Sequence, residues 1–275
     1  MGRCSLTVAL PIISAAGVET VIIPTAVLSN HTGGGFKSWT FRDMTDDILP
    51  IVDHWTDYRH HFDAICTGYL GKKQVPVIAK LFDILKEDDT IVMVDPAMAD
   101  GGKMYPGFDL GFAADMRKLV SKADITVPNL TEAAFLLGEE YRGDDYDEEY
   151  IKETAKKLAD LGPGWVVLSG VSFENDKIGV YTYDRRADKF DYFCTEDIKG
   201  YFHGTGDVFA AALISGMLNG LSLTDSARLA HNLVHNAIKE TVKAGEKELF
   251  YGVRFELAIP AFIREIEAKK SCLSV

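Results

Sequence analysis

The segment HGTGDVFAAALISGML (203–218) has the residue types and the spacing to bind an anion and move a proton. Gly204 and Gly206 permit a tight loop, and the apolar run behind them predicts a helix whose N-terminal amides point at a bound anion. Asp207 stands at the start of that helix. A carboxylate there suits the base that takes a proton from an attacking hydroxyl while the amides stabilise a transferring phosphoryl group. For Gly-x-Gly-Asp alone, a carboxylate that caps the helix is the alternative.

Two better-known phosphate-binding signatures are absent from the sequence. There is no G-x-x-x-x-G-K-[ST] segment, and no G-x-G-x-x-G segment follows a first strand. The sequence therefore disfavours P-loop and dinucleotide-binding proteins, and a small-molecule kinase becomes the leading hypothesis.

The elements that must position this segment alternate along the chain. Short apolar runs rich in β-branched residues predict buried parallel strands at 18–24, 63–68, 90–96, 124–129 and 165–170. Helical periodicity occupies 5–16, 43–60, 74–86, 108–121 and 147–161, and later 207–219, 224–242 and 254–268. The runs 178–184 and 189–195 predict an antiparallel hairpin. The pattern is that of an α/β, doubly wound, mainly parallel sheet with helices on both faces. No repeat or linker interrupts it, so we expect a single domain over 1–275.

Ligands of such sheets bind beyond the carboxyl ends of the strands. The residues found there are Thr32 with Gly33–Gly35, Gly68 with Tyr69, Asp95, Asn129 with Glu132, and Ser169 with Gly170. Polar and glycine residues therefore gather where a substrate pocket is expected.

The composition excludes several other classes of protein. A net charge of −12 repels polyanions, which argues against a nucleic acid or an anionic membrane as partner. The four cysteines are scattered without a C-x-x-C pair, as in a reducing compartment. No run approaches the roughly 18–20 apolar residues of a spanning helix, and the N-terminal residues do not resemble a signal peptide. We expect a cytoplasmic enzyme.

Five ordered motifs carry a family resemblance. GTGD (204–207) with its small-residue helix resembles the ribokinase superfamily. The other four motifs together resemble its pyridoxal (vitamin B6) kinase branch: SNHTGG (29–34), TGY (67–69), DPAMAD (95–100) and VPNLTEAAFLLG (127–138). The resemblance runs from Gly2 to about residue 245.

The resemblance implies roles for residues around the phosphoryl acceptor. Asp207 would be the base that activates the 5′-hydroxyl of pyridoxal, pyridoxine or pyridoxamine, with Gly204, Thr205 and Gly206 as the anion hole. Thr32 and Tyr69 would contact the pyridine ring. Without the resemblance, Tyr69 is interpreted as a half-buried aromatic residue at a strand end.

The resemblance also implies a nucleotide site. Asp95 and Glu132 would position the Mg²⁺ of Mg-ATP, largely through water, and Asp100 would join a cation site. A monovalent cation is left open as a second ion. Asn129 would contact the nucleotide phosphates, and Ser169 would lie on the ATP side.

The chain departs from the family pattern at two places. The family begins with a strand and a short loop carrying a serine that contacts the ring, whereas here Met1 directly precedes Gly2. We therefore expect the first strand to be missing and this chain to melt at a lower temperature than one extended upstream. The family position before Pro128 often carries threonine, and Val127 there weakens one phosphate contact.

Other histidines and one loop have less specific interpretations. His231 and His235 lie four residues apart on a helix but lack the glutamate of H-E-x-x-H, which favours packed or surface histidines over a metal site. His54, His60 and His61 are interpreted as surface residues, and His203 as a structural neighbour of the anion hole. The loop 33–40 is either a lid over the ring or a plain turn.

Competing functions remain at this point. A hydroxymethylpyrimidine kinase would use the same anion hole on a similar aromatic substrate, and a sugar kinase would require more Asp and Asn residues in the early loops. A catalytically silent protein that binds a B6 vitamer or a nucleotide is a third possibility, against which the intact Asp207 and GTG segment weigh. The resemblance implies a homodimer, with a monomer of about 30 kDa as the alternative.

Overall fold

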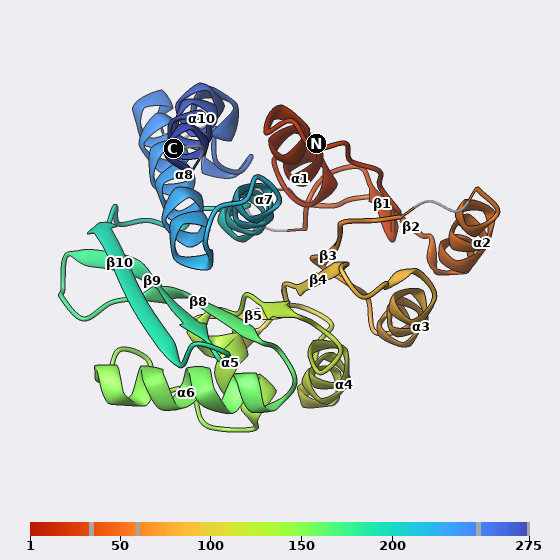
Figure 1. The fold of residues 1–275 in the computed structure, drawn as a ribbon, viewed down its shortest axis with the longest axis horizontal. Coiled ribbons are helices and arrows are strands. Elements are labelled where there is room, and N and C mark those ends of the chain that lie inside the picture. The colour runs from red at the N-terminus through yellow and green to blue at the C-terminus, as the bar shows by residue number, and fades with distance from the viewer. Residues whose placement is uncertain (33–35, 59–60, 246–248, 274–275) are drawn as a thin grey trace. The chain divides into compact units, whose positions relative to one another are not determined.

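The computed structural model describes residues 1–32, 36–58, 61–245 and 249–273 (Figure 1). The glycines of the 33–40 loop, predicted as a lid or a turn, and His60, predicted at the surface, lie outside these residues. Contacts divide the chain into two compact units. The middle unit is Thr45–Thr195, and the terminal unit combines Met1–Met44 with Glu196–Val275.

The middle unit is built on a mainly parallel sheet. Within the described residues its six strands follow the order β10-β9-β8-β7-β4-β3. The parallel members are β3 (Ala64–Thr67), β4 (Ile91–Val94), β7 (Ile125–Thr126) and β8 (Trp165–Val171). The hairpin is made of β9 (Lys177–Asp184), antiparallel to β8, and β10 (Lys189–Glu196). These strands confirm the α/β class and four of the five predicted parallel strands.

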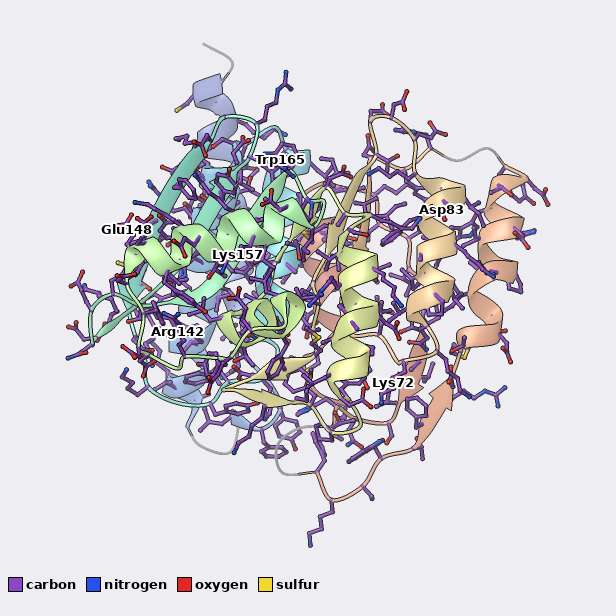
Figure 2. All side chains as sticks on the ribbon, turned by 90° about the horizontal axis from the view of Figure 1, so that it is seen from below. Lys72, Asp83, Arg142, Glu148, Lys157 and Trp165 are labelled. Atoms are coloured by element: carbon purple, nitrogen blue, oxygen red, sulfur yellow. The ribbon has the colours of Figure 1, made fainter. Side chains whose placement is uncertain are left out.

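Burial explains why these runs are strands. Val92, Val94, Ile125 and Val166 are fully buried, as expected for the central strands of a sheet covered on both faces. The helices of this unit are α2 (Thr45–Thr56), α3 (Val75–Leu85), α4 (Leu110–Val120), α5 (Leu130–Leu137) and α6 (Glu148–Asp160). Of these, α5 was not predicted as a helix. Helix α6 carries Glu148 and Lys157, which Figure 2 labels.

The terminal unit is mainly helical. Its elements are α1 (Leu6–Ala15), α7 (Thr205–Leu218), α8 (Leu223–Ala244), the 3-10 turn η1 (Phe255–Leu257) and α10 (Ile259–Leu273), with a small hairpin of β1 (Ala26–Leu28) and β2 (Phe41–Asp43). Helix α7 is buried over the whole run Val208–Gly216 and packs against both α1 and α8. A helix that is apolar on every side is stabilised by packing against neighbouring elements. It therefore forms the core of this unit.

The prediction of a strand at 18–24 was wrong. The segment has no ladder partner, and the bonds described for it are local, from the Val18 amide to the Ile13 carbonyl and from the Thr20 hydroxyl to the Val18 carbonyl. A β-branched run becomes a strand only when a neighbouring strand satisfies its backbone groups. The unit's first strand, β1, begins only at Ala26.

Within the described residues, no helix combines the length and the apolar composition needed to cross a bilayer.

His231 is a packed histidine rather than a metal ligand, as the sequence favoured. It is 8% exposed on α8, and burial together with the nearby His235 lowers the pKa of its imidazole from 6.5 to about 4. The folded state therefore binds fewer protons than the unfolded state between these pH values, so the free energy of unfolding falls as the pH drops from 6.5 towards 4. Urea unfolding at pH 7 and pH 4.5 should show a smaller acid-dependent loss in His231→Gln than in the wild type. Equal losses in the two proteins would contradict this assignment.

Candidate active site

The N-terminus of α7 presents backbone amides without intrahelical partners. Gly204 precedes the helix in the left-handed conformation (φ 78°), and the Val208 amide donates to its carbonyl. As a glycine, the cap residue has no side chain that could bond these amides. The capping alternative for Asp207 is therefore wrong, because Gly204 occupies the cap position and Asp207 lies in the first turn. The first amides of such a helix are available to an anion.

Asp207 has the electrostatic setting of a base. Burial raises the pKa of its carboxyl, and a hydrogen bond from the Ser5 backbone N–H opposes that shift. A carboxylate with a raised pKa holds a proton better, which suits a group that removes one from a hydroxyl. The neighbouring Cys4 thiol has its pKa raised to about 12 by burial and by the charge of Asp207, so it stays protonated.

A cluster of histidine and aromatic rings lies beside the anion hole. The rings of His203 and His31 are 5.0 Å apart, and Tyr201 packs edge-on against His203. Burial and His31 lower the pKa of His203, which keeps its imidazole neutral near pH 7. Thr32 follows His31 directly and is exposed. The structure thus places the predicted Thr32 next to a residue that contacts the anion-hole segment.

In the middle unit, Asn129 and Glu132 form a capping box at the start of α5. The Asn129 side chain accepts from the Glu132 amide (2.9 Å), and the Glu132 carboxylate accepts from the Asn129 amide (3.0 Å). Asn129 also donates to the Ala99 carbonyl (2.8 Å), and Glu132 accepts from the Met98 amide (2.9 Å). The two residues therefore tie α5 to the segment that enters β5 (Ala99–Asp100), which pairs with β6 (Lys103–Met104).

Glu132 is held in an unusual state for a carboxylate. It is 3% exposed, and burial, reinforced by the charge of Asp100, raises its pKa to about 7. Two carboxylates whose charges oppose each other form a setting that a cation would relieve, which fits Mg²⁺. Three backbone N–H groups, from Met98, Ala99 and Asn129, already point at Glu132. If Mg²⁺ were bound here, Glu132 would therefore suit a water-mediated contact better than direct coordination.

Removing Glu132 should destabilise the protein. Glu132→Ala leaves the buried Met98 amide and the partly buried Asn129 amide without acceptors, so we expect a loss of at least about 2 kcal/mol in the free energy of unfolding. Glu132→Gln keeps an acceptor oxygen and should lose less. Urea unfolding of the three proteins measures the order, and an alanine variant as stable as the wild type would show that the capping box is not structural.

The remaining predicted residues follow other strand ends. Asp95 follows β4, is 8% exposed, and its carboxylate accepts from the Ala97 amide (3.1 Å). Ser169, near the end of β8, forms a bridge with Asn129. Tyr69, after β3, is 42% exposed and packs its ring 5.5 Å from that of Phe108, which agrees with a half-buried aromatic residue at a strand end. Asp100 is exposed at the end of β5, where it pairs with Lys103 of β6.

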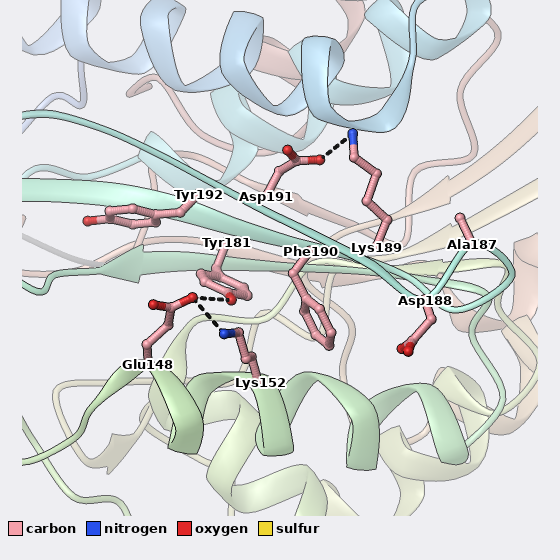
Figure 3. Close-up of a pocket in the computed structure, with 9 residues that line it drawn as sticks. All are labelled: Glu148, Lys152, Tyr181, Ala187, Asp188, Lys189, Phe190, Asp191 and Tyr192. Carbon is pink, nitrogen blue, oxygen red and sulfur yellow. Dashed lines mark hydrogen bonds and ion pairs between the residues drawn. The ribbon is translucent and has the colours of Figure 1, made fainter.

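Two other features of the middle unit are separate from these strand ends. A cavity of about 480 Å³ lies between α6 and the β9–β10 hairpin, where Glu148 bonds both Lys152 and the Tyr181 hydroxyl (Figure 3). None of its lining residues is a predicted site residue. In the described part of the chain, one group of His, Cys, Asp or Glu side chains has the spacing of a metal site, His61 with Glu87 and Asp89. All three are exposed, and the predicted cation residues are not among them.

Sequence analysis missed three residues at the site, Arg3, Cys4 and Ser5. They precede α1, about 200 residues away from the GTGD segment in the sequence, yet the Ser5 N–H acts on the Asp207 carboxyl, and the charge of Asp207 acts on the Cys4 thiol. The available signal was the GRCSLT segment (2–7) at the start of a predicted helix. This segment indicates where the helix begins but not which residues lie against it.

Comparison with protein families places the chain. Residues 12–251 match the model of the phosphomethylpyrimidine kinase family. The chain belongs to this family. The match spans the α7 segment and every predicted site residue. This phosphomethylpyrimidine kinase family member is thus a kinase by descent, which confirms the class of enzyme expected from Asp207 and the anion hole.

Individual relatives of this family member confirm the resemblance to pyridoxal kinases. The pyridoxal kinase PdxY of Actinobacillus pleuropneumoniae is 28% identical over 85% of this chain and 82% of its own length. The structure of pyridoxal kinase from Lactobacillus plantarum is 28% identical and superposes with a TM-score of 0.86, covering 96% of this chain and 93% of that one. A Bacteroides thetaiotaomicron protein, described as a phosphomethylpyrimidine kinase and solved with pyridoxal, is 33% identical with a TM-score of 0.89, covering 95% and 91%.

Proposed function

We propose that this protein transfers the γ-phosphoryl group of ATP to the 5′-hydroxymethyl group of a B6 vitamer: pyridoxal, pyridoxine or pyridoxamine. The observation that carries the proposal is the half-buried Asp207, with a raised pKa, in the first turn of a helix that begins at the glycine-rich loop. The similarity to pyridoxal kinases supports the choice of substrate. The chain would act as one kinase domain.

The proposed mechanism assigns one task to each part of the site. Asp207 takes the proton of the 5′-hydroxyl as the hydroxyl oxygen attacks the γ-phosphorus, the bond from that phosphorus to the bridging oxygen breaks, and ADP leaves. The amides at Gly204, Thr205 and Gly206 stabilise the negative charge on the transferring group. Because Asp207 must be ionised to accept the proton, the rate should fall at low pH, with the acid limb moved upward by the burial that raises its pKa. Thr32 and Tyr69 would contact the pyridine ring.

Nucleotide and metal roles belong to the middle unit. Asn129 would contact phosphate oxygens with the amide hydrogen that it does not donate to Ala99, and Ser169 would lie on the ATP side. Asp95 and Glu132 would hold Mg²⁺ through water, and Asp100 would join the cation site, where a monovalent ion is also accommodated. When bound, Mg²⁺ would neutralise charge on the phosphates.

A second substrate is supported by the family itself. The family is named for phosphomethylpyrimidine kinase, and the Bacteroides relative carries the same description. Hydroxymethylpyrimidine presents the same hydroxymethyl group on an aromatic ring, so the same base and anion hole would serve. A catalytically silent binding protein is the remaining alternative.

An ADP-release assay with Mg-ATP separates these functions. Each of pyridoxal, pyridoxine, pyridoxamine and hydroxymethylpyrimidine is supplied alone, with a no-acceptor reaction as control for ATP hydrolysis. ADP formation that requires a vitamer supports the proposal, and a preference for the pyrimidine supports the second substrate. Binding of a vitamer without turnover would favour the silent protein.

The resemblance also supports a homodimer that acts in the cytoplasm. Light scattering distinguishes a dimer from a monomer of 30.3 kDa.

A further inference from the structure

The backbone of Ser5 is strained and aimed at Asp207. Ser5 has φ 54° and ψ −131°, and among the described residues only Asp188 is a second non-glycine residue with positive φ. Its carbonyl accepts from the Val8 and Ala9 amides in the first turn of α1, while its own N–H donates to Asp207. Strain of this kind persists only where the surroundings enforce it, and it concentrates at functional sites.

Arg3 supplies that enforcement through three bonds to one segment. Its backbone N–H donates to the Tyr251 carbonyl (2.6 Å), and its guanidinium donates to the Gly252 carbonyl (3.1 Å) and to Glu256 (2.9 Å). The same segment is joined to the anion-hole loop, because the Val253 amide donates to the His203 carbonyl (3.0 Å). Arg3 therefore fixes residues 3–5 to the chain that carries Gly204 and Asp207.

Two glycines show how closely this contact is made. A Cβ on Gly204 would lie 2.1 Å from the Arg3 carbonyl oxygen, and a Cβ on Gly252 would lie 2.6 Å from the same atom. Both glycines have positive φ. The Arg3 carbonyl thus lies between the segments at Gly204 and Gly252, which can approach it this closely only because glycine has no Cβ. Residues 3–5 therefore have little freedom to shift.

We propose that Arg3 is a positioning residue for phosphoryl transfer: it holds Ser5 in its strained conformation, so that the Ser5 N–H orients the Asp207 carboxylate towards the acceptor hydroxyl. This inference rests on the proposed function. Arg3 acts through Ser5 and does not touch the reacting atoms.

Few other titratable groups act on Asp207. Helix α1 carries no charged residue, and the Cys4 thiol, with its pKa near 12, stays neutral over the working range. His203 precedes the anion hole with a lowered pKa, and Arg254 and Glu256 lie on the segment that Arg3 contacts. A change in the acid limb of activity therefore reports on Asp207, provided that the profile of His203→Gln is recorded alongside.

The test compares Arg3→Met with Arg185→Met. Arg185 makes the same kinds of bond, to the Ala159 carbonyl (2.7 Å) and to Asp160 (3.1 Å), but belongs to the middle unit. Arg3→Met should lower kcat about tenfold or more, leave KM for ATP and for the vitamer within about twofold, and move the acid limb of kcat upward by about one pH unit. The upward direction follows because losing a donor to the carboxylate raises its pKa. Arg185→Met should lower the melting temperature without moving the acid limb of kcat.

The outcomes separate this inference from the proposed function. If the wild type and Arg185→Met turn over the vitamer and Arg3→Met shows an unchanged pH profile, the positioning role is overturned and the kinase proposal stands. If the wild type shows no turnover, both fail. Should Arg3→Met not fold, Glu256→Gln and Arg3→Lys, which each remove part of the contact, must show intermediate upward shifts of the acid limb, and unshifted profiles in both would overturn the inference.

Discussion

Asp207→Asn is expected to lower kcat for phosphoryl transfer by at least about 100-fold, the range in which loss of a general base falls. The asparagine is almost isosteric and its oxygen still accepts the Ser5 N–H, so the loop and the helix start should keep their geometry. What disappears is the basic oxygen that takes the proton of the acceptor hydroxyl. The measurement is steady-state ADP formation, with ADP and vitamer affinities determined by calorimetry.

The affinities decide how a loss of activity is interpreted. Unchanged binding together with lost turnover assigns Asp207 to the chemical step. Turnover within about threefold of the wild type would contradict its role as base and leave it a buried carboxylate that orders the helix start.

Although the two positions lie two residues apart, Gly204→Ala is expected to lower stability, whereas Gly206→Ala is expected to lower activity in a stable protein. At Gly204 the backbone has φ 78° and a Cβ would lie 2.1 Å from the Arg3 carbonyl oxygen, so we expect a loss of about 1–3 kcal/mol from the backbone conformation alone. At Gly206 a Cβ meets nothing within 4 Å, and alanine favours the helix, so stability should stay within about 1 kcal/mol of the wild type. Urea unfolding measures both.

Activity gives the second half of this comparison. The open space beside Gly206 is where the phosphoryl group is proposed to lie, so its methyl group should lower kcat about tenfold or more in a fully stable protein. A Gly206→Ala variant with wild-type turnover would place the phosphoryl group elsewhere. A Gly204→Ala variant as stable as the wild type would show that residues 3–5 are free to move away.

The sheet could be predicted because the local composition of each strand differs from that of its surroundings. Each central strand is a short β-branched run that ends in Gly, Pro or Asp, and four such runs became β3, β4, β7 and β8. The run 18–24 has the same composition and is no strand, because pairing depends on a neighbour that local sequence does not reveal. Helix α5 was missed because eight mostly buried residues show no polar face to mark a period.

The candidate site was predictable in its types of residue and less so in their roles. Asp207 and the glycines are marked by their spacing, and the structure places them at a helix start as expected. Glu132 was selected as a cation residue, but the N-x-x-E pattern before an apolar run is also a capping box, and the structure forms it. The strained Ser5 is invisible in sequence, since nothing about a serine indicates a positive φ.

The terminal unit combines two segments that lie on either side of the middle unit in the sequence, and this affects folding during translation. The ribosome releases Val8, Ile12 and Ile13 of α1 before the middle unit, whereas α7 and α10, which pack against α1, come after the whole middle unit. The intervening 45–195 segment takes on the order of ten seconds to translate. During that interval the apolar face of α1 lacks the helices that pack against it in the folded protein. The nascent chain is therefore most exposed to aggregation and to chaperone binding before its anion hole exists.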